Sequence, residues 1–266
     1  MSSALIGRSS TKPRRCALCL EVRELQKSHI IPNAIFRRTM RKYDGKLITT
    51  DDSETGVVQR TSDTWWDYLL CKACELHLSQ YEKVGIETMR GERKGILRRH
   101  DYGVTFTGYS YSAMKLYFSA ILWRAAISSL GPFSKVLLPP SLSEKVRRSL
   151  LAGDAPPPFT LACRLALLHD PTPKDRGGMD DEALKELVIS PRLREKVGCF
   201  SFIFVFESYL LEIYVPTIPP ALRNQHGILK REGPWLVPRI NFLEIAELMD
   251  VVGTALRKAD QGMTRL

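Results

Sequence analysis

CALCLEVRELQKSHIIP, residues 16–32, is the stretch that determines how the N-terminal part of this chain folds. It opens with two cysteines separated by two residues, and a second pair of the same spacing, CKAC, follows at residues 71–74. Each such turn can aim both sulfurs at one tetrahedral metal ion, and four thiolates form the ligand set of a structural zinc site. We therefore predict a structural Zn²⁺ with four ligands, Cys16, Cys19, Cys71 and Cys74.

The alternative for a single Cys-x-x-Cys pair is a redox role, and the presence of a second matching pair favours shared zinc. The loop between the pairs, residues 20–70, has 51 residues, which is long for a simple zinc ribbon and leaves room for a functional element. Closing so long a loop with a metal constrains the unfolded chain strongly. The other cysteines, Cys163 and Cys199, stand alone in apolar surroundings and are expected to be buried thiols.

A histidine, His29, lies inside this loop in the sequence KSHIIP. Because Pro32 disfavours helix at the residue before it, we expect residues 28–31 to be extended. A histidine between isoleucines is more often a hydrogen-bonded core residue than a catalyst. The position of His29 between two metal-binding turns favours a catalytic role. The spacing by itself leaves both the catalytic and the core role open.

The composition favours an acidic partner. The net charge is +10 and the isoelectric point is near 9.4. Residues 1–100 hold 19 Lys and Arg against 12 Asp and Glu, so most of the excess positive charge lies in the region that contains the two cysteine pairs. Such a balance is typical of proteins that bind nucleic acid, although it also serves solubility.

No apolar stretch reaches the roughly 20 residues needed to cross a bilayer. The longest, CFSFIFVFESYLLEIYVP from Cys199, is interrupted by Glu207 and Glu212. The N-terminus carries its charge after a short apolar part, the reverse of a signal peptide. We therefore expect a cytoplasmic protein without a membrane partner.

The segments SHIIP, LLCKACELHLSQYE and KLYFSAILWRAAISS resemble the zinc-knuckle branch of the HNH endonucleases, including a group of bacterial HNH-like proteins, over about residues 1–130. The resemblance implies a ββα-metal finger supported by the four-cysteine zinc. It also implies a divalent-metal-dependent endonuclease that cleaves DNA, with RNA as a possible substrate. In that reading His29 is the general base that takes a proton from the attacking water.

The resemblance also implies a second metal, Mg²⁺ or Mn²⁺, held near His29 and on the helix after Cys74. Ser28 stands where the family usually has an acidic residue or histidine, and Asn33 is too close to match the family's middle asparagine. The residues assigned to catalytic and metal roles beside His29 are Ser28 and Asp67, with Asp63 less favoured, and the metal ligands Glu75 and His77.

Two basic clusters flank the expected finger, one after Pro32 and one after the second cysteine pair. Arginine and lysine at such places fit phosphate contacts, and a solvated charged face is the alternative. Trp65 and Trp66 could stack on a base or pack against the zinc module. The basic residues predicted to contact nucleic acid are Arg37, Arg38, Arg41, Lys42, Arg93, Lys94, Arg98 and Arg99.

The fold class predicted is α+β, with an HNH-like zinc-binding domain over 1–103, its first 13 residues flexible, and a mixed α/β domain over 104–266. Periodicity and stop signals predict helices at 111–130 and 141–154, a short helix at 181–187 and an amphipathic helix near the C-terminus. A strand is expected within 159–169 and a hairpin around Glu207–Ser208. This second domain could be a scaffold, sense a target, form a homo-oligomer or bind a partner protein.

Three functions remain in view from the sequence. The first is the endonuclease with His29 as base. The second is a zinc-finger protein that binds nucleic acid without cutting it, which Ser28 and the unmatched asparagine favour. The third is a protein-interaction module that zinc merely stabilises.

Overall fold

A computed structural model describes residues 13–42, 47–50, 58–93, 96–196, 198–262 and 264–265. Residues 1–12, expected to be flexible, and Lys94 lie outside the described residues, as does the side chain of Lys42. The helices are α1 (Asn33–Lys42), α2 (Lys72–Arg90), α3 (Tyr111–Ile127), α4 (Pro140–Ala152), α5 (Asp181–Glu186) and α6 (Ala246–Asp260). The strands are β1 (Arg14–Arg15), β2 (Val22–Arg23), β3 (Leu25–His29), β4 (Leu47–Thr50), β5 (Val58–Thr61), β6 (Trp66–Cys71), β7 (Leu97–His100), β8 (Gly103–Phe106), β9 (Cys163–His169), β10 (Ile189–Lys196), β11 (Cys199–Phe206), β12 (Tyr209–Val215), β13 (Trp235–Asn241) and β14 (Thr264–Arg265).

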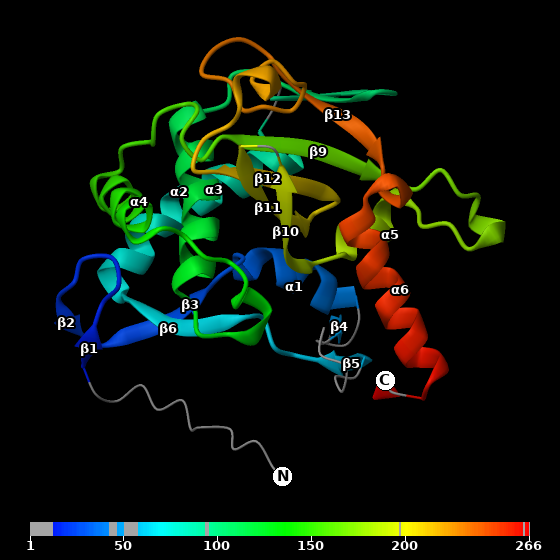
Figure 1. Cartoon of the computed structure of the whole chain (residues 1–266), viewed down its shortest axis with the longest axis horizontal. Helices are drawn as coiled ribbons and strands as arrows, with labels where there is room; N and C mark the ends of the chain where they lie inside the picture. Colours follow the sequence, from blue (N-terminus) through cyan, green and yellow to red (C-terminus); the bar gives the residue numbers. More distant parts are fainter. Residues whose placement is uncertain are drawn as a thin grey trace.

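The N-terminal part is built on two short antiparallel pairs. β1 pairs with β2, and β3 pairs with β6, which leads directly into α2. Between β3 and β6 the described residues form α1 and the β4–β5 pair, so the long loop between the cysteine pairs contains regular secondary structure. Figure 1 shows the β3–β6 pair lying below α2 and α3, with α1 beside it.

A seven-stranded sheet forms the rest of the core, in the order β10-β11-β12-β9-β13-β8-β7. All neighbours are antiparallel except β13 and β9, which are parallel. The predicted domain boundary at residues 103 and 104 falls at the start of β8, and β7 before it joins the same sheet. The division into two domains stays a prediction.

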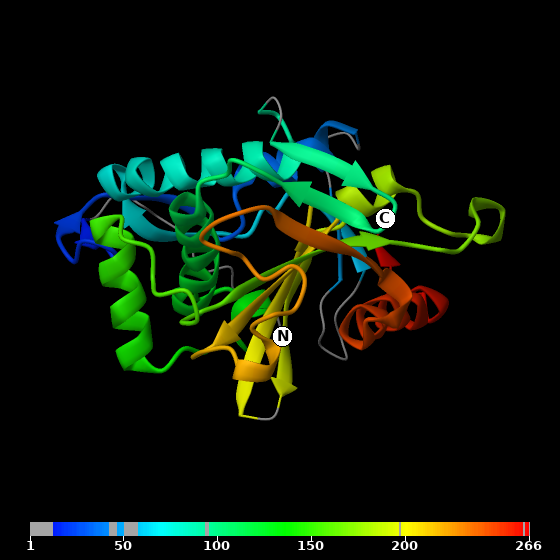
Figure 2. The same ribbon diagram turned by 90° about the horizontal axis from the view of Figure 1, so that it is seen from above.

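The sheet and the N-terminal strands are joined by α3, whose residues 113–125 are all buried. Ser110 caps its first turn by accepting a hydrogen bond from the backbone N–H of Ala113. One continuous apolar core includes Cys16 and Leu18 near the N-terminus and Val237 on β13. α4 and α6 lie at opposite ends of the molecule (Figures 1 and 2).

The mixed α and β architecture is confirmed, and so are the predicted helices at α3, α4, α5 and α6. The predicted strand appears as β9, and β11 and β12 form the hairpin around Glu207 and Ser208. Both turn residues have positive φ, 54° and 60°, the conformation that lets two-residue hairpin turns follow the twist of their strands. None of the described helices combines the length and apolar surface needed to cross a bilayer.

The crossing of α2 and α3 depends on Gly85. A Cβ atom built there would lie 2.2 Å from Cδ1 of the buried Tyr117. We expect Gly85→Ala to destabilise the protein by about 1–3 kcal/mol, because neither helix backbone can retreat without opening the core. Urea unfolding measures this.

The matched control for this substitution is Gly253→Ala on α6. A Cβ atom at Gly253 meets only a terminal nitrogen of Arg257, at 3.5 Å. Alanine there is expected to leave stability unchanged or raise it by up to about 1 kcal/mol, because it lowers the entropy of the unfolded chain. Equal effects at both glycines would contradict the tight helix crossing.

Candidate functional site: a four-cysteine cluster and the His29 cavity

The four cysteines converge between the β1–β2 turn and the start of α2. Their sulfurs all lie within 4.8 Å of one another. A tetrahedral zinc with Zn–S bonds of about 2.3 Å places its sulfurs roughly 3.8 Å apart, and the Cys19 and Cys71 sulfurs are 3.9 Å apart. The cluster can therefore hold a metal ion such as zinc.

Local backbone geometry forms the cluster. Leu20 adopts a positive φ of 67°, which closes the turn after Cys19. The N–H of Cys71 donates to the Cys16 sulfur at 3.3 Å. Burial acts to raise the pKa of the Cys16 thiol, but N–H groups of Cys71, Cys19 and Leu18 bring that pKa below its ordinary value. These donors favour the thiolate, which is the form that binds metal.

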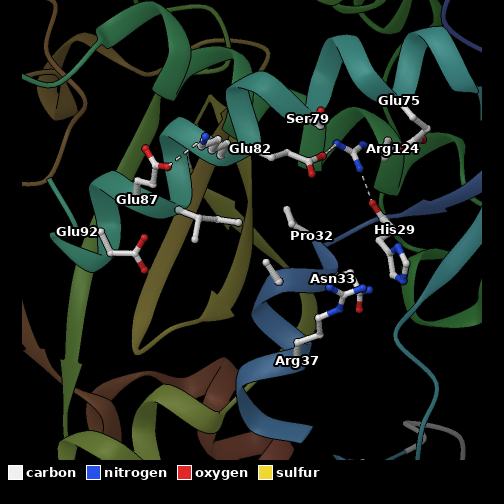
Figure 3. A pocket seen from close by; sticks show the side chains of 13 residues that line it. His29, Pro32, Asn33, Arg37, Glu75, Ser79, Glu82, Glu87, Glu92 and Arg124 are labelled. Carbon is white, nitrogen blue, oxygen red and sulfur yellow. Dashed lines mark hydrogen bonds and ion pairs between the residues drawn. The ribbon is translucent and has the colours of Figure 1, made fainter. Parts of the chain in front are cut away.

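His29 lies at the end of β3, opposite Trp66, on the wall of a cavity of about 410 Å³. The cavity opens between β3, α1 and α2, with Arg124 of α3 at its wall (Figure 3). The residues lining it are His29, Pro32, Asn33, Ala34, Arg37, Glu75, Ser79, Glu82, Lys83, Ile86, Glu87, Glu92 and Arg124.

The two sides of the cavity differ in charge. Figure 3 shows the His29 ring pointing to the side where Asn33 and Arg37 lie, at the start of α1. Across from them α2 presents Glu75 and Glu82, seven residues apart and so on one face of the helix. The cavity therefore has a polar and cationic side around the imidazole and an acidic side along α2.

The imidazole of His29 is held by one hydrogen bond, between Nε2 and the Thr64 hydroxyl at 3.0 Å. Burial and, to a smaller extent, the positive charge of Arg124 lower the pKa of His29 to about 4. The ring is therefore neutral near neutral pH. A neutral imidazole whose Nε2 donates to Thr64 keeps Nδ1 as a proton acceptor.

This lowered pKa predicts a pH dependence of stability. The folded pKa of about 4 lies below the unfolded value of 6.5, so the contribution of His29 is present above pH 6.5 and is lost as the pH falls toward 4. The loss is at most about 1.4 kcal/mol per pH unit, and solvent at the cavity mouth reduces it.

We expect His29→Gln to lose about 1 kcal/mol less stability than wild type between about pH 7.5 and about pH 5.5. Urea unfolding at the two pH values measures the difference. The exposed His226 provides the control, since His226→Gln should leave the pH dependence of wild type unchanged. An equal change in the free energy of unfolding between the two pH values for wild type and His29→Gln would contradict the burial of the ring.

The other residues predicted around His29 lie in different places. Ser28 is buried, and its hydroxyl accepts a hydrogen bond from the N–H of Leu70 at 3.1 Å. The same hydroxyl acts to lower the pKa of the Glu75 carboxyl. Asp67 accepts hydrogen bonds from the N–H and hydroxyl of Ser129, at 3.0 and 2.7 Å. His77 contacts the carbonyl of Leu150 at 2.8 Å and does not line the cavity.

Glu75 is the one predicted metal ligand that faces the cavity with His29. Burial raises the pKa of its carboxyl, while Arg124 and the Ser28 hydroxyl act to lower it. One of its oxygens, Oε1, is buried without a hydrogen-bond partner, and so is Nε of Arg124. Two complementary buried groups, an acceptor and a donor, thus remain unsatisfied at this wall.

The residues present do not fit a catalytic Mg²⁺ or Mn²⁺. Within the described chain, the four cysteines are the only group of three or more His, Cys, Asp or Glu close enough to share a metal. The guanidinium of Arg124 is ion-paired with Glu82, so a cation nearby would meet its charge. Two unit charges about 4 Å apart repel by about 4 kcal/mol at a protein surface, and a divalent ion doubles this.

The basic residues predicted to contact nucleic acid lie in different environments. Arg37 is exposed and lines the cavity. Arg38 pairs with Glu207 and Glu182 at 3.0 and 3.5 Å, and Arg93 pairs with Glu87 at 3.5 Å. The remaining described side chains are exposed: Arg41 on α1, and Arg98 and Arg99 on β7.

Trp65 and Trp66 also differ. Trp65 is buried and packs edge-on against Phe36 and Phe133. Trp66 is half-buried, and the Lys27 ammonium lies 4.5 Å from its ring centre. Packing therefore accounts for Trp65.

Sequence reasoning missed Arg124, Glu82 and Asn33 as cavity residues, and it missed Thr64 as the hydrogen-bond partner of His29. Arg124 could have been noticed, because a lone arginine in the apolar helix KLYFSAILWRAAISS must find a buried anionic partner. Glu82 could have been found by its seven-residue spacing from Glu75.

A scan of protein-family models, a search of curated proteins and a search of solved structures each gave no match.

Proposed function

We propose that this chain hydrolyses phosphodiester bonds of nucleic acid at the His29 cavity, in the manner of an HNH endonuclease stabilised by a structural zinc. The observation that carries the proposal is the placement of a neutral imidazole at the wall of an open cavity. The strand that bears it is joined through β6 to the cysteine cluster and to α2. DNA is the substrate favoured by the resemblance, and RNA is the alternative.

His29 is the general base in this proposal. It takes a proton from a water molecule whose oxygen forms the new bond to phosphorus. The bond from phosphorus to the leaving sugar oxygen breaks, and that oxygen takes a proton from solvent. A base with a pKa near 4 is weak at neutral pH, so positioning of the phosphate must supply much of the rate.

Arg37 and the start of α1 supply that positioning. Arg37 projects into the cavity and contributes to lowering the pKa of His29, which indicates that its charge acts near the ring. Asn33 begins α1, whose N-terminal N–H groups favour an anion. A phosphate beside His29 would therefore meet one guanidinium and one helix terminus.

The test is cleavage of supercoiled plasmid, linear duplex and end-labelled single strands of DNA and RNA by zinc-loaded protein. We expect His29→Ala to lower the cleavage rate by about 10²- to 10⁴-fold while it keeps its zinc. The control His226→Ala removes an exposed histidine outside the cavity and should cleave like wild type. Equal cleavage by wild type and His29→Ala would refute the proposal.

The second candidate is a zinc-stabilised protein that binds nucleic acid without cutting it. The ion pair of Arg124 with Glu82 favours it, because that pair occupies carboxylate capacity that a metal nuclease would use. Salt-sensitive binding of nucleic acid, weakened by Arg37→Ala, with no cleavage under any condition would select this candidate.

A further inference from the structure

A single buried cation stands at the wall of the His29 cavity. Arg124 is 1% exposed and comes from α3, whose neighbouring residues are apolar. It lies outside the β3–β6 pair and α2, yet its guanidinium reaches into the space between them (Figure 3). The position of this charge therefore requires an explanation beyond packing.

The guanidinium joins three elements. One terminal nitrogen donates to the backbone oxygen of His29 on β3. The other is hydrogen-bonded and ion-paired with Glu82 on α2. Glu75, two turns of α2 closer to the cysteines, adds a second negative charge that acts on Arg124.

These partners are oxygen atoms of the kind that bind a hard divalent cation: one carbonyl and one carboxylate in direct contact, with a second carboxylate nearby. They lie between the strand of His29 and the helix after Cys74, where the resemblance places the catalytic metal. We propose that Arg124 takes the place of the divalent cation in this cavity, so that a phosphodiester is held there without Mg²⁺ or Mn²⁺. This rests on the proposed function of the cavity.

The substitution has clear chemical consequences. A guanidinium is permanently charged and cannot be removed by a chelator. It carries one charge where Mg²⁺ carries two, and it donates hydrogen bonds where the ion would accept lone pairs. The cavity should therefore bind and process its substrate in buffer freed of divalent cations, with only the structural zinc in place.

The test is a titration of zinc-loaded protein with Mn²⁺, in which electron paramagnetic resonance measures the concentration of the free ion. Wild type is expected to bind no Mn²⁺ in the micromolar range. Arg124→Met, which keeps much of the side-chain volume, should free Glu75 and Glu82 and gain one Mn²⁺ site. The double variant Arg124→Met with Glu82→Gln should lose that site again.

Two results would overturn the inference. One is Mn²⁺ binding by wild type that Glu82→Gln abolishes. The other is a folded, zinc-bound Arg124→Met that gains no Mn²⁺. If Arg124→Met does not fold, the wild-type and Glu82→Gln titrations still decide: micromolar Mn²⁺ binding that depends on Glu82 overturns the inference, and its absence supports it.

Cleavage assays separate this inference from the proposed function. Cleavage that needs added Mg²⁺, together with a Glu82-dependent Mn²⁺ site in wild type, overturns the role of Arg124 and leaves the nuclease standing. Mn²⁺ binding gained only in Arg124→Met, with no cleavage by wild type in any buffer, supports the role of Arg124 and overturns the nuclease.

Discussion

Removal of zinc is expected to unfold the N-terminal part of this protein and to loosen the rest. The four cysteines connect the β1–β2 turn to the junction of β6 and α2, and two-residue strands such as β1 and β2 cannot persist alone. Structural zinc contributes roughly 10–16 kcal/mol in small zinc modules. Since Cys16 and Leu18 belong to the same core as the large sheet, the loss should extend beyond the cluster.

The variant for this prediction is Cys71→Ser, and the control is Cys199→Ser, which changes a cysteine outside the cluster. We expect one zinc per chain in wild type and in Cys199→Ser. In Cys71→Ser we expect loss of tight zinc and rapid proteolysis of residues 13–93. Full helical circular dichroism and protease resistance in a zinc-free Cys71→Ser protein would contradict a structural role for the metal.

Glu207→Ala is expected to be the most damaging single substitution at the contact between the N-terminal helices and the large sheet. Glu207 is 5% exposed at the β11–β12 turn, where it accepts from Arg90 of α2 and from Arg38 of α1. Removing the carboxylate takes the closest ion-pair partner from the largely buried Arg90, which keeps only the longer contact with the exposed Glu92 and a hydrogen bond to the Ala34 carbonyl. Breaking a buried pair costs about 3–5 kcal/mol, and the partial exposure of Arg38 places the expected loss near the lower end.

The control for Glu207 is Glu182→Ala. Glu182 pairs with the same Arg38 but its side chain is 60% exposed, so its loss should cost less than about 1 kcal/mol. Chemical unfolding of both variants measures the difference. Similar small effects at the two positions would show that the turn does not anchor the helices.

Local sequence signals predicted the elements that carry the candidate site. The cysteine spacing predicted a shared cluster, and apolar periodicity predicted α3. Of the extended segment that Pro32 predicted over residues 28–31, only Ser28 and His29 belong to β3, and residues 30 and 31 form a bend. Each of these depends on residues close together in the chain or on one metal-binding turn repeated. The HNH assignment itself stays a prediction.

Contacts between distant segments could not be predicted in the same way. The β3–β6 register shifts between Gln26 and Lys27, and a shift of one residue reverses the face on which a side chain lies. The hydrogen bond of Asp67 with Ser129, 62 residues away, therefore could not be predicted from the sequence pattern. The contact of Arg124 with the His29 carbonyl spans 95 residues and depends on how α3 crosses α2.

The most direct test of the proposed function is whether a phosphodiester enters the His29 cavity. We would titrate a thymidine dinucleotide into zinc-loaded protein and follow the imidazole nitrogen resonances of all five histidines. If the cavity holds a phosphodiester, we expect saturable shifts at His29, abolished by Arg37→Ala, while the exposed His226 stays unchanged. Saturable binding that moves other histidines and leaves His29 unchanged would contradict the proposed function.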